Sequence, residues 1–270
     1  MNFSGSRWAM EETALRALVE RYNAAIIAHG RIEATASQEE IATAQSSLRV
    51  ERGIAIINIR GSLFQYNDLW SWFFGGSTYE SIEVQFRAAL QSPEVKSILF
   101  DVNSPGGEVD GCNELATLIY KARGTKPSLA YVMGYGASAA YELASSASVI
   151  VTAPDAMLGS IGVKTVLYDT TAAMEQDGVV KYDIVSSQSP YKVVDPASKE
   201  SRDRVQAIID DTAAVFVKSV AQHRGVTEDQ VLENFGKGDC FVGSLACDAG
   251  LADYVDTLEN TLAFMAKQYR

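Results

Sequence analysis

The chain has 270 residues, 47% of them hydrophobic, with a formal net charge of -11 and a pI near 4.7. This acidity excludes the basic surface with which nucleic-acid-binding proteins neutralise phosphates. No apolar run reaches the roughly 18–20 residues of a membrane span, and the N-terminus lacks the apolar core of a secretory signal, so we expect a cytoplasmic protein without a membrane anchor.

The first 50 residues predict a helical extension followed by a linker. Apolar residues recur at helical spacing from residue 11 to residue 29, and Gly30 ends the pattern. Residues 31–45 are polar and rich in alanine, as in a linker. We divide the chain into an N-terminal helical extension with its linker (1–50), a main domain (51–257) and a C-terminal helix (258–270).

In the main domain, predicted strands alternate with predicted helices. Runs of β-branched residues, beginning with IAIINIRGSLF at Ile54, indicate strands, and a period of 3.6 residues indicates helices. We expect strands at 54–64, 97–102, 128–133, 149–152, after 159–163, at 182–186 and at 240–242. We expect helices at 79–90, 108–123, 139–147, 170–176, 198–223, 226–235 and from 258 onward. This alternation predicts βαβ units and a mostly parallel sheet, which is an α/β fold.

One serine is a candidate nucleophile. Ser138 lies in GYGASAAYELA, where a predicted strand gives way to a helix, a usual position for a nucleophile. The pattern lacks G-x-S-x-G, and the two histidines, His29 and His223, both fall in predicted helices, so a Ser-His-Asp triad is disfavoured. A lysine base remains, provided that burial lowers its pKa from about 10.4 toward neutrality. Lys192 in SSQSPYKVVDP fits best, and Lys164 is the competitor.

A glycine-rich turn, NSPGG at residues 103–107, follows another predicted strand. Its two glycines would let backbone N–H groups approach a substrate, as an oxyanion hole requires. Such a turn can also bind phosphate, but this one lacks the Lys-Ser/Thr of a P-loop and the spacing of a dinucleotide site. A plain tight turn is the other interpretation.

The cysteines point to no metal site. Cys112, Cys240 and Cys247 have no C-x-x-C spacing and no histidine partner nearby. We therefore expect free thiols in a reducing compartment, without a disulfide framework, a metal or a cofactor.

The order of the motifs resembles one peptidase family. SPGG, then G-x-x-A-S-x-x-Y, then GSIGV, then a lysine in a short polar loop is similar to the signal peptide peptidase A family of serine peptidases. The resemblance covers roughly residues 54–257. It implies a ClpP/crotonase-like fold, a superhelix of repeated ββα and βαβ units with a mostly parallel sheet, and a Ser-Lys dyad.

The resemblance also implies a role for each site residue. Ser138 would be the nucleophile and Lys192, at a family-like separation of 54 residues (192 − 138 = 54), the general base. Ser160 in GSIGV would orient the lysine. The backbone N–H groups of Gly107 and Ala139 would form the oxyanion hole, with Gly106 shaping the turn. The sequence departs from the family in having alanines rather than glycines after the serine, and in lacking a membrane anchor.

With its soluble N-terminal extension, the chain looks more like the capsid-maturation (prohead) proteases of tailed phages, of the protein C type. That implies degradation of the scaffold protein and trimming of capsid proteins in the host cytoplasm or inside the procapsid. It also implies a homo-oligomeric ring, in which serine and lysine can come from neighbouring subunits.

Three alternatives stay open. The first is a cytoplasmic peptidase that degrades cleaved signal peptides, and the second is a crotonase-like acyl-CoA enzyme. The third is a catalytically silent capsid assembly module. The aromatic stretch at residues 69–74 is either core or subunit contact, or a hydrophobic substrate groove.

Overall fold

The structure is a computed structural model that describes residues 7–10, 14, 16–20, 48–67, 71 and 75–269. Of the helix predicted from residue 11 to residue 29, the described residues 14 and 16–20 are helical. The linker and most of the aromatic stretch lie outside the described residues.

The main sheet is mostly parallel, as predicted. Its strands are β2 (Arg49–Glu51), β3 (Ile54–Arg60), β6 (Ser97–Ser104), β8 (Ser128–Ala137), β9 (Val149–Thr152), β10 (Met157–Gly159), β11 (Cys240–Val242) and β12 (Tyr254–Val255). They run in the order β11, β10, β8, β6, β3, β2, with β9 beside β8 and β12 beside β9. Only the edge strands β2 and β11 pair antiparallel in this sheet. The central strands β3 and β6 are rich in Ile, Leu and Val and almost wholly buried, as is typical of a parallel sheet.

On one side, strand β8 pairs with two different strands, one along each half of its length. Its first half pairs with β9, and its second half, Tyr135 to Ala137, pairs with β10. The ladder to β6 shifts register between these halves. The serine turn therefore follows the part of β8 that lies beside β10.

A second sheet of four strands was not predicted. It runs β1 (Trp8–Met10), β7 (Gly106–Glu108), β4 (Leu63–Phe64) and β5 (Ser77–Thr78), and β1 pairs antiparallel to β7. Because Gly106–Glu108 is a strand, the helix predicted to start at residue 108 begins instead at Cys112.

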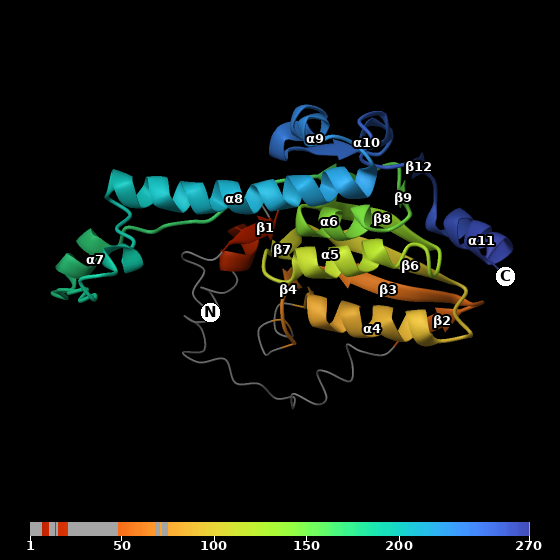
Figure 1. Cartoon of the computed structure of the whole chain (residues 1–270), viewed down its shortest axis with the longest axis horizontal. Helices are drawn as coiled ribbons and strands as arrows, with labels where there is room; N and C mark the ends of the chain where they lie inside the picture. Colours follow the sequence, from red (N-terminus) through yellow and green to blue (C-terminus); the bar gives the residue numbers. More distant parts are fainter. Residues whose placement is uncertain are drawn as a thin grey trace.

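The helices cover the main sheet and extend beyond it (Figure 1). They are α4 (Tyr79–Gln91), α5 (Cys112–Lys121), α6 (Ala139–Ser145), α7 (Thr171–Gln176), α8 (Lys199–Arg224), α9 (Glu228–Asn234), α10 (Ser244–Asp248) and α11 (Leu258–Gln268). In Figure 1, α4, α5 and α6 are stacked along the sheet, and α8 packs on α5 and α6 with its C-terminal half only. Helix α4 shows the local logic: Thr78 caps its N-terminus, and Ile82, Phe86 and Ala89 form its buried face.

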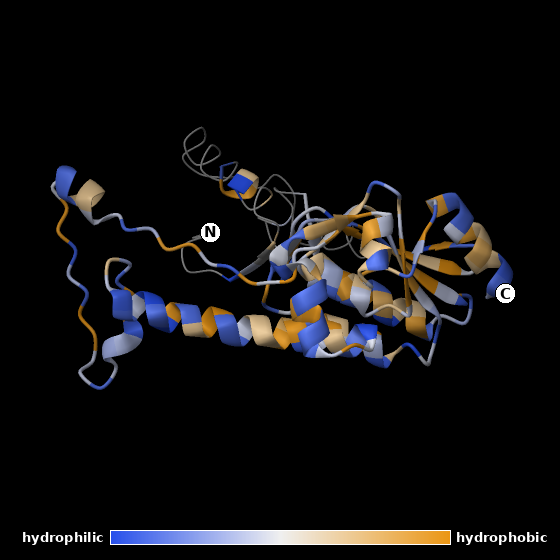
Figure 2. Cartoon of the chain, turned by 90° about the horizontal axis from the view of Figure 1, so that it is seen from above, coloured by the Kyte–Doolittle hydropathy of each residue, from blue (hydrophilic) through white to orange (hydrophobic). Residues whose placement is uncertain are grey.

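Residues 168–198, which we call the arm, project from the body together with the N-terminal half of α8 (Figures 1 and 2). The strand predicted at 182–186 is not formed, and among the described residues no strand lies beside this segment to pair with it. Its apolar side chains are exposed, 82% for Tyr182 and 94% for Ile184. The arm thus presents apolar surface that its own chain does not cover.

Candidate active site

Ser138 lies in a strained turn between β8 and α6. Its backbone has φ 55° and ψ -124°, a conformation that costs a residue with a side chain free energy. The turn is fixed because the Ser138 N–H donates to the Gly159 carbonyl at 2.7 Å and the Ser138 carbonyl accepts from the Glu142 N–H at 3.0 Å. The residue is 1% exposed, and its Oγ has no hydrogen-bond partner among the described residues. A buried hydroxyl without a partner is unfavourable unless it has a functional use.

The glycine turn lies next to this serine, since β7 packs against α6. Gly106 has φ 100°, which favours glycine, and its N–H donates to Ser104 Oγ at 3.1 Å. A Cβ on Gly107 would lie 2.0 Å from the Leu63 carbonyl oxygen, so this glycine is needed where β4 and β7 meet. The Ala139 N–H is among the first of α6, which have no acceptor within the helix. The predicted oxyanion residues are therefore held on rigid elements beside Ser138.

Ser160 is brought beside Ser138 by the strand register. Gly159 of β10 lies opposite Ala137 of β8, so the next residue of each strand is one of the two serines. Ser160 also has a positive φ, 52°, and its N–H donates to the Asp239 carbonyl at 2.8 Å. It lines a cavity of about 370 Å³ together with residues that include Met10, Gly162 and Lys164.

The two candidate lysines lie in different places. Lys192 ends the short helical turn Pro190–Lys192 in the arm and is exposed. This turn packs on the start of α8, where Arg204 lies 4.1 Å over the Tyr191 ring. Ser138, Ser160, Gly106, Gly107 and Ala139 are thus brought together within one chain, but Lys192 is not. Lys164 lies nearer, in the wall of the Ser160 cavity.

The histidine in the described part of the chain is not placed to serve the serine. His223 Nδ1 lies 2.9 Å from Ser145 Oγ, at the opposite end of α6 from Ser138. Seven residues of helix separate the two serines (145 − 138 = 7), which is about 10 Å. Burial, and next the charge of Arg123, lower the pKa of His223 to about 4. The other histidine, at position 29, lies outside the described residues.

Sequence reasoning missed a buried carboxyl group one helical turn after Ser138. Glu142 is 4% exposed, and its Oε1 accepts from Asn113 Nδ2 at 2.8 Å. Burial raises the pKa of Glu142, while the hydrogen bond from Asn113 acts in the opposite direction. The sequence did contain a signal for this buried group, since Glu142 is the one acid in the otherwise mostly apolar run AAYELAS. It ties α6 to α5 and so helps to hold the serine turn.

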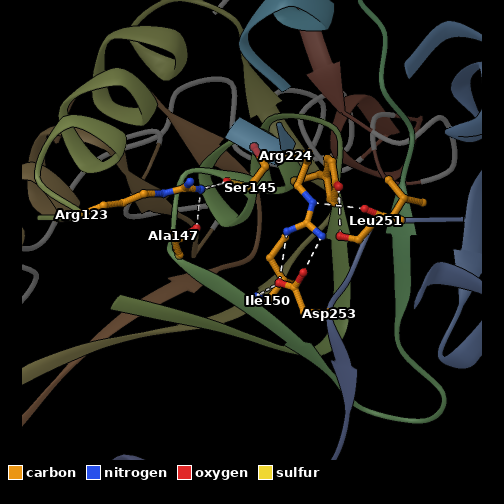
Figure 3. Close-up of polar contacts among 9 residues, drawn as sticks. Arg123, Ser145, Ala147, Ile150, Arg224, Leu251 and Asp253 are labelled. Atoms are coloured by element: carbon orange, nitrogen blue, oxygen red, sulfur yellow. Dashed lines mark hydrogen bonds and ion pairs between the residues drawn. The ribbon is translucent and has the colours of Figure 1, made fainter. Parts of the chain in front are cut away.

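Two arginines hold the far end of α6 and the strand behind it (Figure 3). Arg123 donates to the carbonyls of Ser145 and Ala147. Arg224 forms two bonds to Asp253, of 2.7 and 3.1 Å, and Asp253 accepts from the Ile150 N–H at 2.7 Å. Burial alone would raise the pKa of Asp253, but these hydrogen bonds lower it below its ordinary value.

Within the described residues, no cluster of three or more His, Cys, Asp or Glu side chains could hold a metal ion. The three cysteines are free thiols, and Cys112 is buried. None of the described helices has the length and apolarity to cross a membrane.

Known proteins resemble much of this chain. A model described as peptidase family S49 matches residues 121–270, which include Ser138, Ser160 and Lys192. Capsid assembly protease C of Escherichia phage lambda is 31% identical over 210 residues, 77% of this chain and 47% of that protein. Head-tail preconnector protein GP5 of Enterobacteria phage P21 is 30% identical over 223 residues, 81% of this chain and 44% of that protein. The chain spans about half the length of these relatives.

Among solved structures, an enoyl-CoA hydratase from Shewanella pealeana has a TM-score of 0.50, covering 84% of this chain and 75% of that one. The sequence identity is 12%, so the similarity concerns the fold alone. The predicted crotonase-like α/β fold is confirmed.

Proposed function

The chain belongs to peptidase family S49, and we propose that it is a serine endopeptidase in which Ser138 is the nucleophile and Lys192 the general base. The observation that carries this proposal is the state of Ser138, a buried, strained serine whose hydroxyl has no partner among the described residues. A structural serine would satisfy its hydroxyl within the fold, as Ser145 does with the Glu142 carbonyl at 2.7 Å.

The reaction would follow the usual course of acyl transfer. Ser138 Oγ attacks a peptide carbonyl while the Lys192 amine takes the serine proton, and the resulting ammonium then gives that proton to the leaving amine. The Gly107 and Ala139 N–H groups stabilise the oxyanion. Water, activated by the same lysine, releases the acyl group and restores the serine. Ser160 orients the lysine amine.

The position of Lys192 supports an active site shared between copies of the chain. The arm carries Lys192 away from the serine turn of its own chain, and its apolar side chains need a cover. A second copy of the chain would bury the apolar side chains of the arm and would place its own serine turn, which lacks a base, near Lys192. Head-to-tail contacts of this kind form a ring when the rotation between copies closes, and we propose such a homo-oligomeric ring.

The substrates are proposed from the relatives' names. Both phage relatives are named for capsid assembly or the head-tail connector. We propose that this chain degrades a scaffold protein and trims capsid proteins, in the host cytoplasm or inside the procapsid. A peptidase that degrades cleaved signal peptides in the cytoplasm is the second candidate.

Co-expression with a scaffold protein tests the function. Wild type, Ser138→Ala and Ser145→Ala are each expressed with a phage capsid scaffold protein as the candidate substrate, and the masses of the products are measured by intact-mass spectrometry. Scaffold fragments with wild type and Ser145→Ala, but not with Ser138→Ala, are expected. Equal fragmentation with Ser138→Ala would refute the assignment of the nucleophile. The crotonase alternative predicts instead a thermal shift with acyl-CoA that does not depend on Ser138.

A further inference from the structure

The N-terminal strand β1 lies where an extended polypeptide would have to bind. It pairs antiparallel with β7, so that Ala9 lies opposite Gly107 and Met10 opposite Gly106. These two glycines form the turn that we assign to the oxyanion hole. The Arg7 carbonyl also accepts from the Val109 N–H at 3.4 Å.

The other edge of β1 is also bonded. The Trp8 N–H donates to the Lys164 carbonyl at 2.9 Å, and the Lys164 N–H donates to the Trp8 carbonyl at 3.0 Å. The segment therefore lies between β7 and the chain that follows Ser160, with hydrogen bonds on both edges. This is the strand-addition mode by which proteins bind extended peptides.

Side chains anchor the same segment. Trp8 is 2% exposed and Met10 3% exposed, and Met10 lines the cavity that Ser160 and Lys164 also line. Arg7 forms an ion pair with Asp110 and donates to Thr212 Oγ1 at 3.3 Å. Burying a large apolar side chain contributes roughly 1.5–3 kcal/mol of stabilisation. Burial of Trp8 and Met10 therefore holds residues 7–10 against the rest of the protein.

Strand β1 runs toward the glycine turn at residues 103–107. Trp8 lies opposite Glu108, farther along β7, and Met10 lies opposite the first residue of β7, beside the turn. The polypeptide thus advances from its N-terminal side toward the oxyanion groups. We infer that residues 7–10 are an internal inhibitory segment, which occupies the polypeptide groove of its own chain and excludes a substrate until it is displaced. The inference deepens the proposed function and rests on it, because the groove excludes a substrate only if the chain is a peptidase.

Tethering makes such a segment effective even when its intrinsic affinity is weak. A segment linked to its site has an effective concentration on the order of 1 mM. If its intrinsic Kd is on the order of 100 µM, a competing peptide binds with an apparent affinity reduced about tenfold. A variant in which β1 is loosened should therefore bind the competing peptide about tenfold more tightly than wild type does.

The test uses the full chain and a fluorescent nonapeptide with the sequence of residues 4–12, SGSRWAMEE, as the probe. Ala9→Pro removes an N–H of β1 opposite Gly107, Trp8→Ala removes the apolar anchor, and Trp8→Phe is the matched control that keeps it. We expect Ala9→Pro and Trp8→Ala to bind the peptide about tenfold more tightly than wild type, with Trp8→Phe close to wild type. Because two different changes loosen the strand, misfolding of one does not decide the outcome.

Peptide binding is measured in a Ser138→Ala background and peptide hydrolysis in the parent background, so the two proposals can fail separately. Tighter binding in Ala9→Pro and Trp8→Ala would support the inhibitory segment whether or not this peptide is hydrolysed, because the peptidase is tested separately by the scaffold co-expression. Hydrolysis with the same peptide affinity and the same KM in all four chains would support the peptidase and overturn the inference.

Discussion

Mixing two inactive variants tests whether the serine and the lysine of one active site come from different chains. Ser138→Ala lacks the proposed nucleophile, and Lys192→Ala lacks the proposed base. Within one chain, the Lys192 turn packs beside Arg204, whereas α6 packs on the part of α8 near Phe216. Twelve residues of helix separate these positions (216 − 204 = 12), which is about 18 Å, and proton transfer needs about 3 Å.

The magnitude follows from counting sites. In an equal mixture, half of the sites contain an intact serine, and half of those meet an intact lysine from the neighbour, so about one quarter of wild-type activity returns. A dyad formed within one chain would return none. The assay is hydrolysis of a fluorogenic peptide by co-expressed variants, with native mass spectrometry to show that both assemble together. Mixed assemblies without activity would refute the shared site, and loss of activity in Lys164→Ala alone would transfer the role of base to that residue.

Three further predictions concern stability and the glycine turn. The pKa of His223 is lowered to about 4 in the folded chain from an ordinary 6.5, so the unfolded chain binds a proton first as the pH falls. Acidification from pH 6.5 to pH 4 should therefore lower the free energy of unfolding by up to about 3 kcal/mol. Urea unfolding at stepped pH should show this decrease in wild type and not in His223→Gln, and the same decrease in both would contradict the assignment. Arg224→Ala removes a partly exposed ion pair with Asp253 and the hydrogen bond to the Gly250 carbonyl, and should cost about 1–2 kcal/mol, measured by urea unfolding, whereas a cost near zero would show that the pair is not structural. Gly107→Ala puts a Cβ 2.0 Å from a backbone oxygen of β4 and should lower peptidase activity on the order of 100-fold; Gly124→Ala, with no atom within 4 Å, is the control, and equal activity of the two would refute the argument.

The sequence predicted β3, β6, β8 and β9, because these strands contain apolar runs that are buried on both faces, so propensity and burial agree. It placed the next strand after residue 163, whereas the structure has β10 at Met157–Gly159. Strand β7 has no such signal. Its sequence, GGE, is extended only because β4 and β1 pair with it. The strand predicted at 182–186 fails for the opposite reason, since β-branched residues without a pairing partner do not form a sheet.

For the site, the residues that act through local turns could be predicted, and those that act through packing could not. Ser138 stands out because it lies where the strand predicted at 128–133 gives way to a helix, whereas Ser160 was singled out only by the resemblance of GSIGV to the family motif. Glu142 belongs to the same helix as Ser138, but only the packing of α5 and α8 buries it and turns it into a support. The separation of Lys192 from Ser138 within one chain depends on the course of the arm, which no local pattern encodes.

The two proposals together make proteolysis conditional on two events. A single chain has a serine turn without its base, because the arm carries Lys192 outward, and its polypeptide groove is filled by residues 7–10. Assembly would bring a lysine from a neighbour, yet it would leave the groove occupied. Displacement of β1 alone would free the groove, yet it would leave Ser138 without a base. On these proposals activity requires both events. A newly made, unassembled chain would then be unable to digest other proteins, and a tightly binding substrate could itself complete the activation by replacing β1 along β7.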